Sequence, residues 1–155
     1  MLTELMAGRP GQDAAPEAEI ASLREASERW VGHHFDRDLI SLIAELDGNL
    51  AATAGLIWFE HPPSLANRAG TEAYILNVYT RPDARPMGLA RTLIERLVEH
   101  AKAAGVTRVW LRTSRQGRPL YESIGFRTQD DDMRLTEPEP ASEPASEPEP
   151  EPGPP

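Results

Sequence analysis

The chain has 155 residues, of which 39% are hydrophobic, and its formal net charge is −9. This length and composition suit about one globular domain. It contains no cysteine, and this excludes a disulfide framework, a thiolate metal site and a cysteine nucleophile. No run of about 18 apolar residues could span a membrane, and Glu4 interrupts the N-terminus before an apolar leader core could form. We therefore expect a cytoplasmic protein without a membrane partner.

The first expected elements are a helix and a β-hairpin. Segment 16–31 predicts an amphipathic helix, because apolar residues recur near helical spacing from Ile20 to Trp30. Two β-prone runs follow at 40–46 and 50–59, and the Asp47-Gly48-Asn49 sequence between them is a strong signal for a tight hairpin turn.

A strand and a long helix are expected next. β-branched and aromatic residues are frequent from Tyr74 to Thr80, and Arg81-Pro82 ends this strand. The turn at 85–90 leads directly into a helix that Gly105 closes at its C′ position. The residues expected in its buried stripe are Leu89, Leu93, Ile94, Leu97, Val98 and Ala101.

The start of that helix is a candidate anion site. The first N–H groups of a helix have no partner within the helix, and the positive end of the helix dipole lies at the same place. A helix N-terminus therefore attracts anions, and phosphate is the anion most often bound there. Gly88 and the small Ala90 leave room for a ligand to approach the backbone, and Arg85 and Arg91 add positive charge. This pattern alone also fits a plain connection between a strand and a helix.

The remaining elements complete an α/β pattern. A strand is expected at 107–113, followed by a short helix within 117–126 that has Pro119 in its first turn. Phe126 would open a final strand that Met133 and Leu135 could close. We expect a mixed, mostly antiparallel sheet with helices on its faces.

Two motifs in this order resemble the GCN5-related N-acetyltransferases. Arg85-x-x-Gly88-x-Ala90 matches that family's pyrophosphate signature, and Leu120-Tyr121-Glu122 with Gly125-Phe126 resembles its second conserved segment. A closer similarity is to uncharacterised bacterial members, which share the sequences at 77–80 and 117–121. The resemblance is clearest over residues 39–135, and it implies one acetyltransferase domain over residues 1–135.

The resemblance implies acetyl-CoA as co-substrate and assigns residues to it. Exposed backbone at Val78 and Thr80 would pair with the pantetheine arm, and the Val78 N–H would face the thioester oxygen. Ser114 stands where many members have a cofactor-holding asparagine. The pyrophosphate would lie against the backbone at Met87, Gly88, Leu89, Ala90 and Arg91, beside the charge of Arg85.

The same resemblance implies direct acetyl transfer to an amine in a ternary complex, and the absence of cysteine suits that route. Tyr121 would protonate the departing thiolate, since the ordinary pKa values of a phenol and a thiol are about 10 and 8.5. Glu72 and Glu60 are candidates for the base that deprotonates the amine, and water is a third candidate. The identity of the amine acceptor stays open, although the mild acidity of the domain suits a cation.

Some features point away from the common family pattern. Members usually open with a β-strand, yet the residues before Pro16 do not predict one, so this first strand could be missing. The strand at 40–46 would then present an open edge to another chain, which would favour a homodimer. A non-catalytic acyl-CoA-binding or interaction module is therefore the alternative function. Adjacent His33 and His34 point in different directions on a helix or a strand, so we expect no metal site.

The C-terminal segment 136–155 differs from the rest of the chain in composition. It holds six glutamates and eight prolines and has no lysine or arginine. Such a segment lacks the apolar side chains that would offset the entropy of ordering, so we expect an extended, disordered tail. It would act as a solubilising appendage or as an acidic interaction tail. Its charge repels phosphate, and we expect no nucleic-acid partner.

Overall fold

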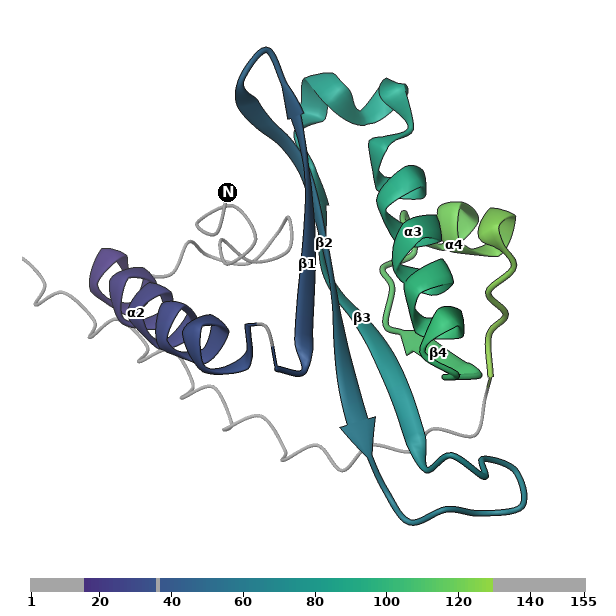
Figure 1. Ribbon diagram of the computed structural model, residues 1–155. Helices are drawn as coiled ribbons and strands as arrows, with labels where there is room; N and C mark the ends of the chain where they lie inside the picture. Colours follow the sequence, from purple (N-terminus) through teal and green to yellow (C-terminus); the bar gives the residue numbers. More distant parts are fainter. Residues whose placement is uncertain (1–15, 36, 130–155) are drawn as a thin grey trace, which may run out of the picture.

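The computed structural model describes residues 16–35 and 37–129 (Figure 1). The elements in chain order are α2 (Glu17–His34), β1 (Leu39–Leu46), β2 (Asn49–Glu60), β3 (Thr71–Thr80), the 3-10 helix η1 (Pro82–Met87), α3 (Leu89–Ala103), β4 (Arg108–Leu111) and α4 (Arg118–Ile124). Within this part of the chain the strands form one sheet in the order β1-β2-β3-β4. The first three strands are antiparallel and β4 runs parallel to β3. The expected mixed, mostly antiparallel α/β sheet is confirmed.

The hairpin between β1 and β2 forms as its sequence predicts. Leu46 pairs with Asn49, so Asp47 and Gly48 make a two-residue turn. Both turn residues have positive φ, 51° and 74°. This is the geometry that suits the right-handed twist of the flanking strands, and Asp-Gly adopts it readily.

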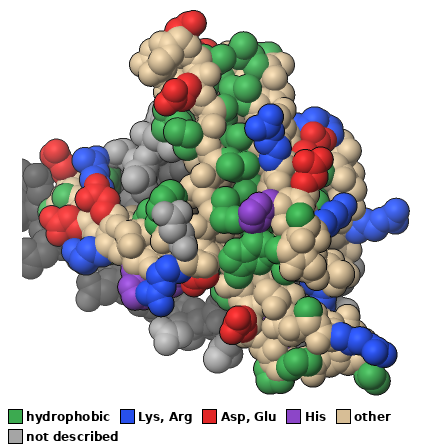
Figure 2. Space-filling model, viewed as in Figure 1, with side chains coloured by type: hydrophobic (Ala, Val, Ile, Leu, Met, Phe, Trp, Pro, Cys, Tyr) green, Lys and Arg blue, Asp and Glu red, His purple; other side chains and the backbone are tan. Residues whose placement is uncertain are grey.

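The core lies between the sheet and α3, which covers one face of the sheet together with α4 (Figure 1). Ala52, Ala54 and Ala73 line the sheet side and are each 0% exposed. Their small side chains leave room for Ile94 and Leu97 of α3, which are also fully buried. Figure 2 shows hydrophobic side chains along the seam between β1 and α3. The expected stripe of α3 is confirmed, although Leu89 and Val98 are only partly buried.

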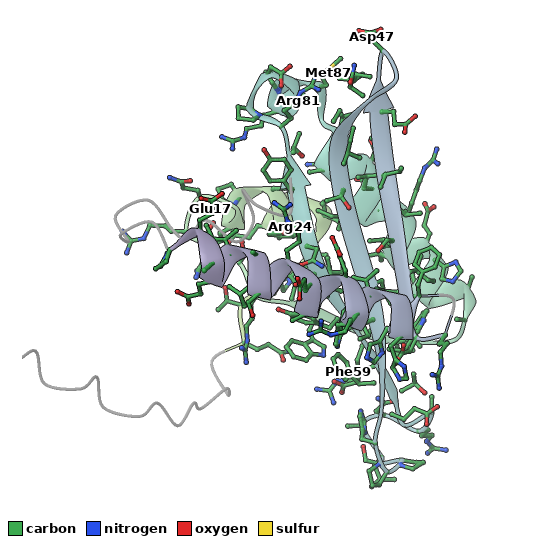
Figure 3. All side chains as sticks on the ribbon, turned by 90° about the vertical axis from the view of Figure 1, so that its left-hand side faces the viewer. Glu17, Arg24, Asp47, Phe59, Arg81 and Met87 are labelled. Atoms are coloured by element: carbon green, nitrogen blue, oxygen red, sulfur yellow. The ribbon has the colours of Figure 1, made fainter. Side chains whose placement is uncertain are left out.

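α2 is longer than expected and buries little. It extends to His34, whose Nδ1 lies 2.8 Å from a carboxylate oxygen of Asp38. None of its residues is fully buried, and the side chains of Leu23 and Trp30 are 44% and 39% exposed. The helix crosses in front of the sheet on the face opposite α3 (Figure 3). The apolar spacing therefore identified the helix but not a buried face.

The end of the described chain differs from the expected pattern. β4 is four residues long, because the chain leaves the sheet after Leu111 and turns toward α4. Phe126 does not open a strand, and residues 126–129 have no regular structure. The proposed closing residues Met133 and Leu135, the segment 136–155 and the residues before Pro16 lie outside the described residues. No helix of the described part has both the length and the apolar character to cross a membrane.

Candidate active site

The two parallel strands diverge, and this opens the sheet beside β3. β3 pairs with β4 from Glu72 to Ile75 only, yet β3 continues to Thr80. β4 ends at Leu111, opposite Ile75. Beyond Ile75, β3 therefore has β2 on one side and no neighbouring strand of the described sheet on the other. A strand edge of this kind can hydrogen-bond an extended ligand.

A β-bulge lies within the diverging half of β3. The register against β2 shifts by one residue between Thr53 and Gly55, and Asn77 has a φ of 52°. Asparagine is among the few residues other than glycine that adopt this left-handed conformation readily. Because of the extra residue, Asn77 is exposed and Val78 packs against the core on the same face as Ile75. Bulges bend a strand and redirect its side chains, and this one accompanies the separation from β4.

Replacing Asn77 tests the cost of the bulge. We expect Asn77→Val to lower the free energy of unfolding by about 1–2 kcal/mol, since a β-branched residue resists positive φ. Asn77→Gly should lie within about 0.5 kcal/mol of the parent, because glycine adopts this φ freely. Urea unfolding followed by circular dichroism measures both. Equal stability of the valine and glycine variants would contradict the strain argument.

The start of α3 faces open space. η1 leads into Gly88, which has a φ of 71° and forms the N-cap of α3 without any side-chain cap. The first cap bond runs from the Thr92 N–H to the Gly88 carbonyl, 3.2 Å apart, so the amides of residues 89–91 precede the intrahelical ladder. A Cβ built on Gly88 would have no heavy atom within 4 Å. The helix start thus has the amide donors, the dipole and the open space that an anion site requires.

Residues at the junction of β3 and η1 lie close to this helix start. Arg85 donates from Nε to the Thr80 carbonyl, 3.4 Å away, and is otherwise exposed. The Thr80 hydroxyl oxygen is buried and has no hydrogen-bond partner among the described residues. Met87 is 57% exposed. Arg81 and Asp83 form an ion pair of 2.7 Å at the start of η1, and the hydrogen bond from Arg81 lowers the pKa of the Asp83 carboxyl.

The turn between β4 and α4 uses Ser114 for its own structure. The Ser114 hydroxyl accepts a hydrogen bond of 3.2 Å from the Gly117 N–H. Its carbonyl accepts from the Gly117 and Arg118 amides. A Cβ on Gly117 would lie 2.7 Å from the Thr113 hydroxyl, so a larger residue there would force the Thr113 side chain to move. These contacts fix the start of α4 and hence the position of Tyr121 one turn later.

Tyr121 is half-buried on α4. Its ring lies edge-on to Phe126, with centroids 6.0 Å apart, and it also packs against the core. Burial raises the pKa of the phenol above its ordinary value, and the nearby Tyr74 raises it further. The Tyr121 hydroxyl therefore keeps its proton at neutral pH and can act as a donor. Tyr74 belongs to β3, so this interaction links Tyr121 to the strand that carries Val78.

The side chain of Arg91 joins two helices. Its guanidinium donates to the Ser123 hydroxyl and carbonyl on α4, and it also contacts Glu95 at 3.2 Å. The sequence pattern suggested Arg91 only as a positive charge near the helix start. The structure gives its side chain a second part in holding α4, and with it Tyr121, against α3.

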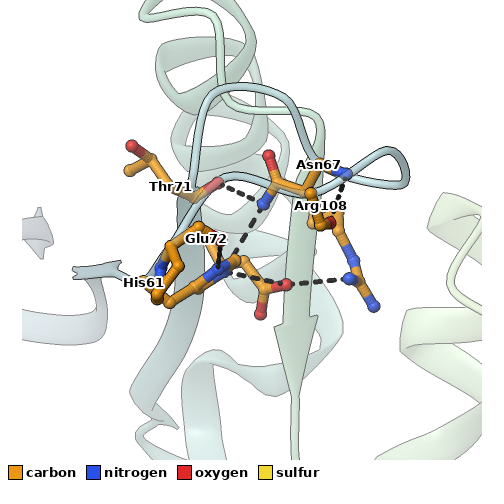
Figure 4. A network of polar contacts seen from close by, with 7 residues as sticks. His61, Asn67, Thr71, Glu72 and Arg108 are labelled. Carbon is orange, nitrogen blue, oxygen red and sulfur yellow. Dashed lines mark hydrogen bonds and ion pairs between the residues drawn. The ribbon is translucent and has the colours of Figure 1, made fainter.

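Glu72 lies at the opposite end of β3 from the bulge. One carboxylate oxygen is 3.1 Å from Arg108 Nη1 and 3.3 Å from His61 Nε2 (Figure 4). Glu72 stands six positions before Val78, which is about 20 Å along an extended strand. Glu60 is at the same end of the sheet, where it pairs with Thr71. Neither candidate base is therefore brought to the diverging half of β3.

The contacts around Glu72 hold the loop between β2 and β3. Buried Asn67 donates from Nδ2 to the Thr71 carbonyl at 3.1 Å, and the same nitrogen lies 3.5 Å from His61 Nε2 (Figure 4). A Cβ on Gly70 would lie 2.5 Å from the His61 carbonyl oxygen. These residues form a structural network that includes the Glu72 carboxylate.

Sequence reasoning missed Asn77 and the arginine partners of Glu72 and Ser123. An asparagine inside a strand of β-branched and aromatic residues is the one signal that could have indicated the bulge. The contacts of Arg91 and Arg108 join segments that are distant along the chain, so no local sequence pattern predicts them.

The fold agrees with comparisons to known proteins. The model of the acetyltransferase (GNAT) family matches residues 8–126. The chain belongs to this family. The expected membership of the GCN5-related N-acetyltransferase family is thus confirmed.

Individual GNAT proteins show where the similarity lies. Glucosamine 6-phosphate N-acetyltransferase of Trypanosoma brucei brucei is 33% identical over 73 residues, which is 47% of this chain and 50% of that protein. Mycothiol acetyltransferase of Beutenbergia cavernae is 33% identical over 114 residues, 72% of this chain and 36% of that protein. The chain thus spans half or less of the curated relatives it matches. A crystal structure of a predicted acetyltransferase with acetyl-CoA from Clostridium acetobutylicum superimposes with a TM-score of 0.70 at 27% identity, covering 87% of this chain and 85% of that one.

Proposed function

We propose that this protein is an acetyl-CoA-dependent N-acetyltransferase that moves the acetyl group directly to a primary amine. One observation carries the proposal. The open edge of β3 beyond Ile75, on the side where β4 has ended, leads through η1 into a glycine-capped helix start whose first amides precede the intrahelical hydrogen bonds. A ligand with an extended, amide-containing arm and a phosphate at one end suits this arrangement. The edge of β3 can hydrogen-bond the amides of the arm, and the start of α3 can bind the phosphate.

The fit to acetyl-CoA can be examined at individual residues. The backbone from Met87 to Arg91 would hold the pyrophosphate, and the open space at Gly88 admits it. The buried Thr80 hydroxyl has unused hydrogen-bonding capacity where the pantetheine arm would pass. Arg85 is exposed beside it and adds positive charge. Pro86 in η1 has no N–H, so the donors come from the residues that follow it.

The chemistry assigned to these residues is acyl transfer through a tetrahedral intermediate. The amine attacks the thioester carbon, and the Val78 N–H would donate to the oxygen on which negative charge develops. A donor aimed at such an oxygen contributes about 3 kcal/mol of barrier lowering in acyl-transfer enzymes. As the carbon–sulfur bond breaks, the Tyr121 phenol would give its proton to the departing thiolate. Burial keeps that proton on Tyr121 until it is needed.

The amine must lose a proton, and we assign that proton to water. Glu72 stands about 20 Å along the strand from Val78, and its carboxylate contacts two cationic or proton-bearing groups, Arg108 and His61. Glu72 therefore enters the proposal as a residue that holds the loop and not as the base.

The acceptor is proposed only as a class. The two relatives described above carry the names of a glucosamine 6-phosphate acetyltransferase and a mycothiol acetyltransferase, so the names point to different acceptors. The chain spans 50% and 36% of those proteins. We therefore extend to this protein the donor, acetyl-CoA, and a primary amine as acceptor.

Calorimetric titration with acetyl-CoA, followed by thiol release with a panel of amines, tests this function. We expect one site with a Kd in the micromolar range, about −8 kcal/mol, and amine-dependent release of CoA. Binding without thiol release from any amine would favour the non-catalytic module instead. No binding by the folded protein would contradict both.

A further inference from the structure

Four exposed arginines lie along the segment that leads from the end of β4 past α4, and none of them has an acidic partner among the residues that the structure describes. We call this group the arginine surface; it comprises Arg112, Arg115, Arg118 and Arg127. All are exposed, and none forms an ion pair with a described residue. Other arginines of the described chain do so, for example Arg81 with Asp83 and Arg108 with Glu72. Glu122 is the single acidic residue between 112 and 129. The arginine surface is therefore strongly cationic.

The arginine surface lies on the segment that also carries proposed site residues. Arg112 directly follows β4, Arg115 lies next to Ser114, and Arg118 is the first residue of α4. Arg127 follows α4, on which Tyr121 lies. An anion bound here would stand close to the proposed path of acetyl-CoA.

The same chain supplies a matching anion. Residues 136–155 contain six glutamates and no lysine or arginine, and they follow the arginine surface in the sequence. We propose that this acidic tail binds the arginine surface of its own chain and leaves it when acetyl-CoA binds. Opposite charge makes the two segments complementary, and a covalent tether raises their effective concentration to the millimolar range.

The length of chain permits this contact. Arg118 and Gln129 are joined by α4, about 10 Å long, and by five residues that reach at most about 17 Å, so they lie within about 27 Å of each other. Glu147 is 18 positions beyond Gln129 and could reach about 60 Å when extended. The tail therefore has enough length to return to the arginine surface with several glutamates.

The function of this contact rests on the proposed acetyl-CoA site. The phosphates of acetyl-CoA and the glutamates of the tail are both anions that would approach the same cationic segment. The tail would weaken acetyl-CoA binding at low ionic strength. At about 1 M salt the Debye length falls to about 3 Å, and the weakening should disappear.

A spin label on the tail tests docking without acetyl-CoA. The chain has no cysteine, so Ser146→Cys gives one labelling site in the full-length protein. We expect amide signals of residues 112–118 to broaden at low salt and to recover at high salt. They should also recover in a full-length variant with all six tail glutamates changed to glutamine. Unchanged signals at low salt would overturn the proposal.

Charge-matched variants identify the surface. Arg115→Gln with Arg118→Gln should reduce the broadening of the remaining signals several-fold. Arg68→Gln with Arg96→Gln removes the same charge from exposed positions in the β2–β3 loop and on α3, and should leave it unchanged. An equal loss in both pairs would show attraction to net charge alone and would overturn the assigned surface.

Acetyl-CoA titration tests the displacement. We expect the six-glutamine variant to bind acetyl-CoA about five-fold more tightly than the parent at low salt, and equally at high salt. Displacement would be overturned if the parent and the six-glutamine variant had equal Kd values for acetyl-CoA at low salt, and if acetyl-CoA did not change the broadening in the parent. If the parent shows broadening but binds no acetyl-CoA, the result supports docking of the tail and contradicts the proposed function. Failure of the proposed function can therefore be distinguished from failure of the docking proposal.

Discussion

Gly88→Glu is expected to weaken acetyl-CoA binding by about 100-fold or more. The substitution places a carboxylate in the open space before α3, where the free amides and the helix dipole would hold the pyrophosphate. A like charge at contact distance repels the phosphate, and the side chain fills the approach. Calorimetric titration at one fixed salt concentration measures the change in Kd.

Gly105→Glu is the matched control for this variant. Gly105 has a φ of 80°, and a Cβ there would also meet nothing within 4 Å. Both variants carry the same strain and the same new charge, but Gly105 follows the opposite end of α3. We expect similar losses in stability, and a Kd for the Gly105 variant within about two-fold of the parent. Gly88→Ala adds the strain without the charge. Comparable losses of acetyl-CoA affinity in the Gly88→Glu and Gly105→Glu variants would contradict the assignment of the anion site to the start of α3.

Tyr121→Phe is expected to lower kcat by about 100-fold, within the range for a general acid. The ring keeps its place beside Phe126 and only the hydroxyl is lost, so the Kd for acetyl-CoA should stay within about two-fold. Steady-state kinetics with an accepted amine, together with calorimetry, separate the two quantities. A fall in affinity equal to the fall in kcat would show that the hydroxyl serves in binding.

The pH dependence of the wild type follows from the raised pKa of Tyr121. Burial shifts that pKa upward from 10.0, so the phenol stays protonated as the pH rises from 7 to 9. We expect no loss of kcat in this range from ionisation of Tyr121. Tyr74→Phe is the control. It removes the hydroxyl that raises the pKa of Tyr121 further, and the phenylalanine keeps an aromatic ring against Trp110. Its kcat should change by less than about three-fold.

Much of the fold could be predicted because its signals are local. Asp47-Gly48 specifies a turn by the φ angles it adopts, and the stripe of α3 repeats with the period of a helix. The limits of α2 and β4 depend on what the chain meets elsewhere. α2 has no fully buried residue, so its apolar spacing overstated its packing. β4 is short because the turn at Ser114 draws the chain away from the sheet.

The candidate site was less predictable than the fold. The glycine at the helix start and the tyrosine of α4 stand in motifs, but the geometry that relates them arises from distant contacts. Arg91 reaches Ser123 across 32 positions of the sequence. Arg108 meets Glu72 from a neighbouring strand. The role expected of Glu72 came from its place before a strand, and its partners became visible only once the strands were paired.

The alanines on the inner face of the sheet have a consequence for how this protein can vary. Ala52, Ala54 and Ala73 determine how near α3 lies to the strands. Gly88 begins that helix and Val78 lies on one of those strands. A larger side chain at any of these alanines would push the helix outward and widen the gap between the proposed phosphate contacts and the proposed thioester contacts. Under the proposed function, core substitutions of this kind would change catalysis even where the protein still folds, so the interior and the candidate site are constrained together.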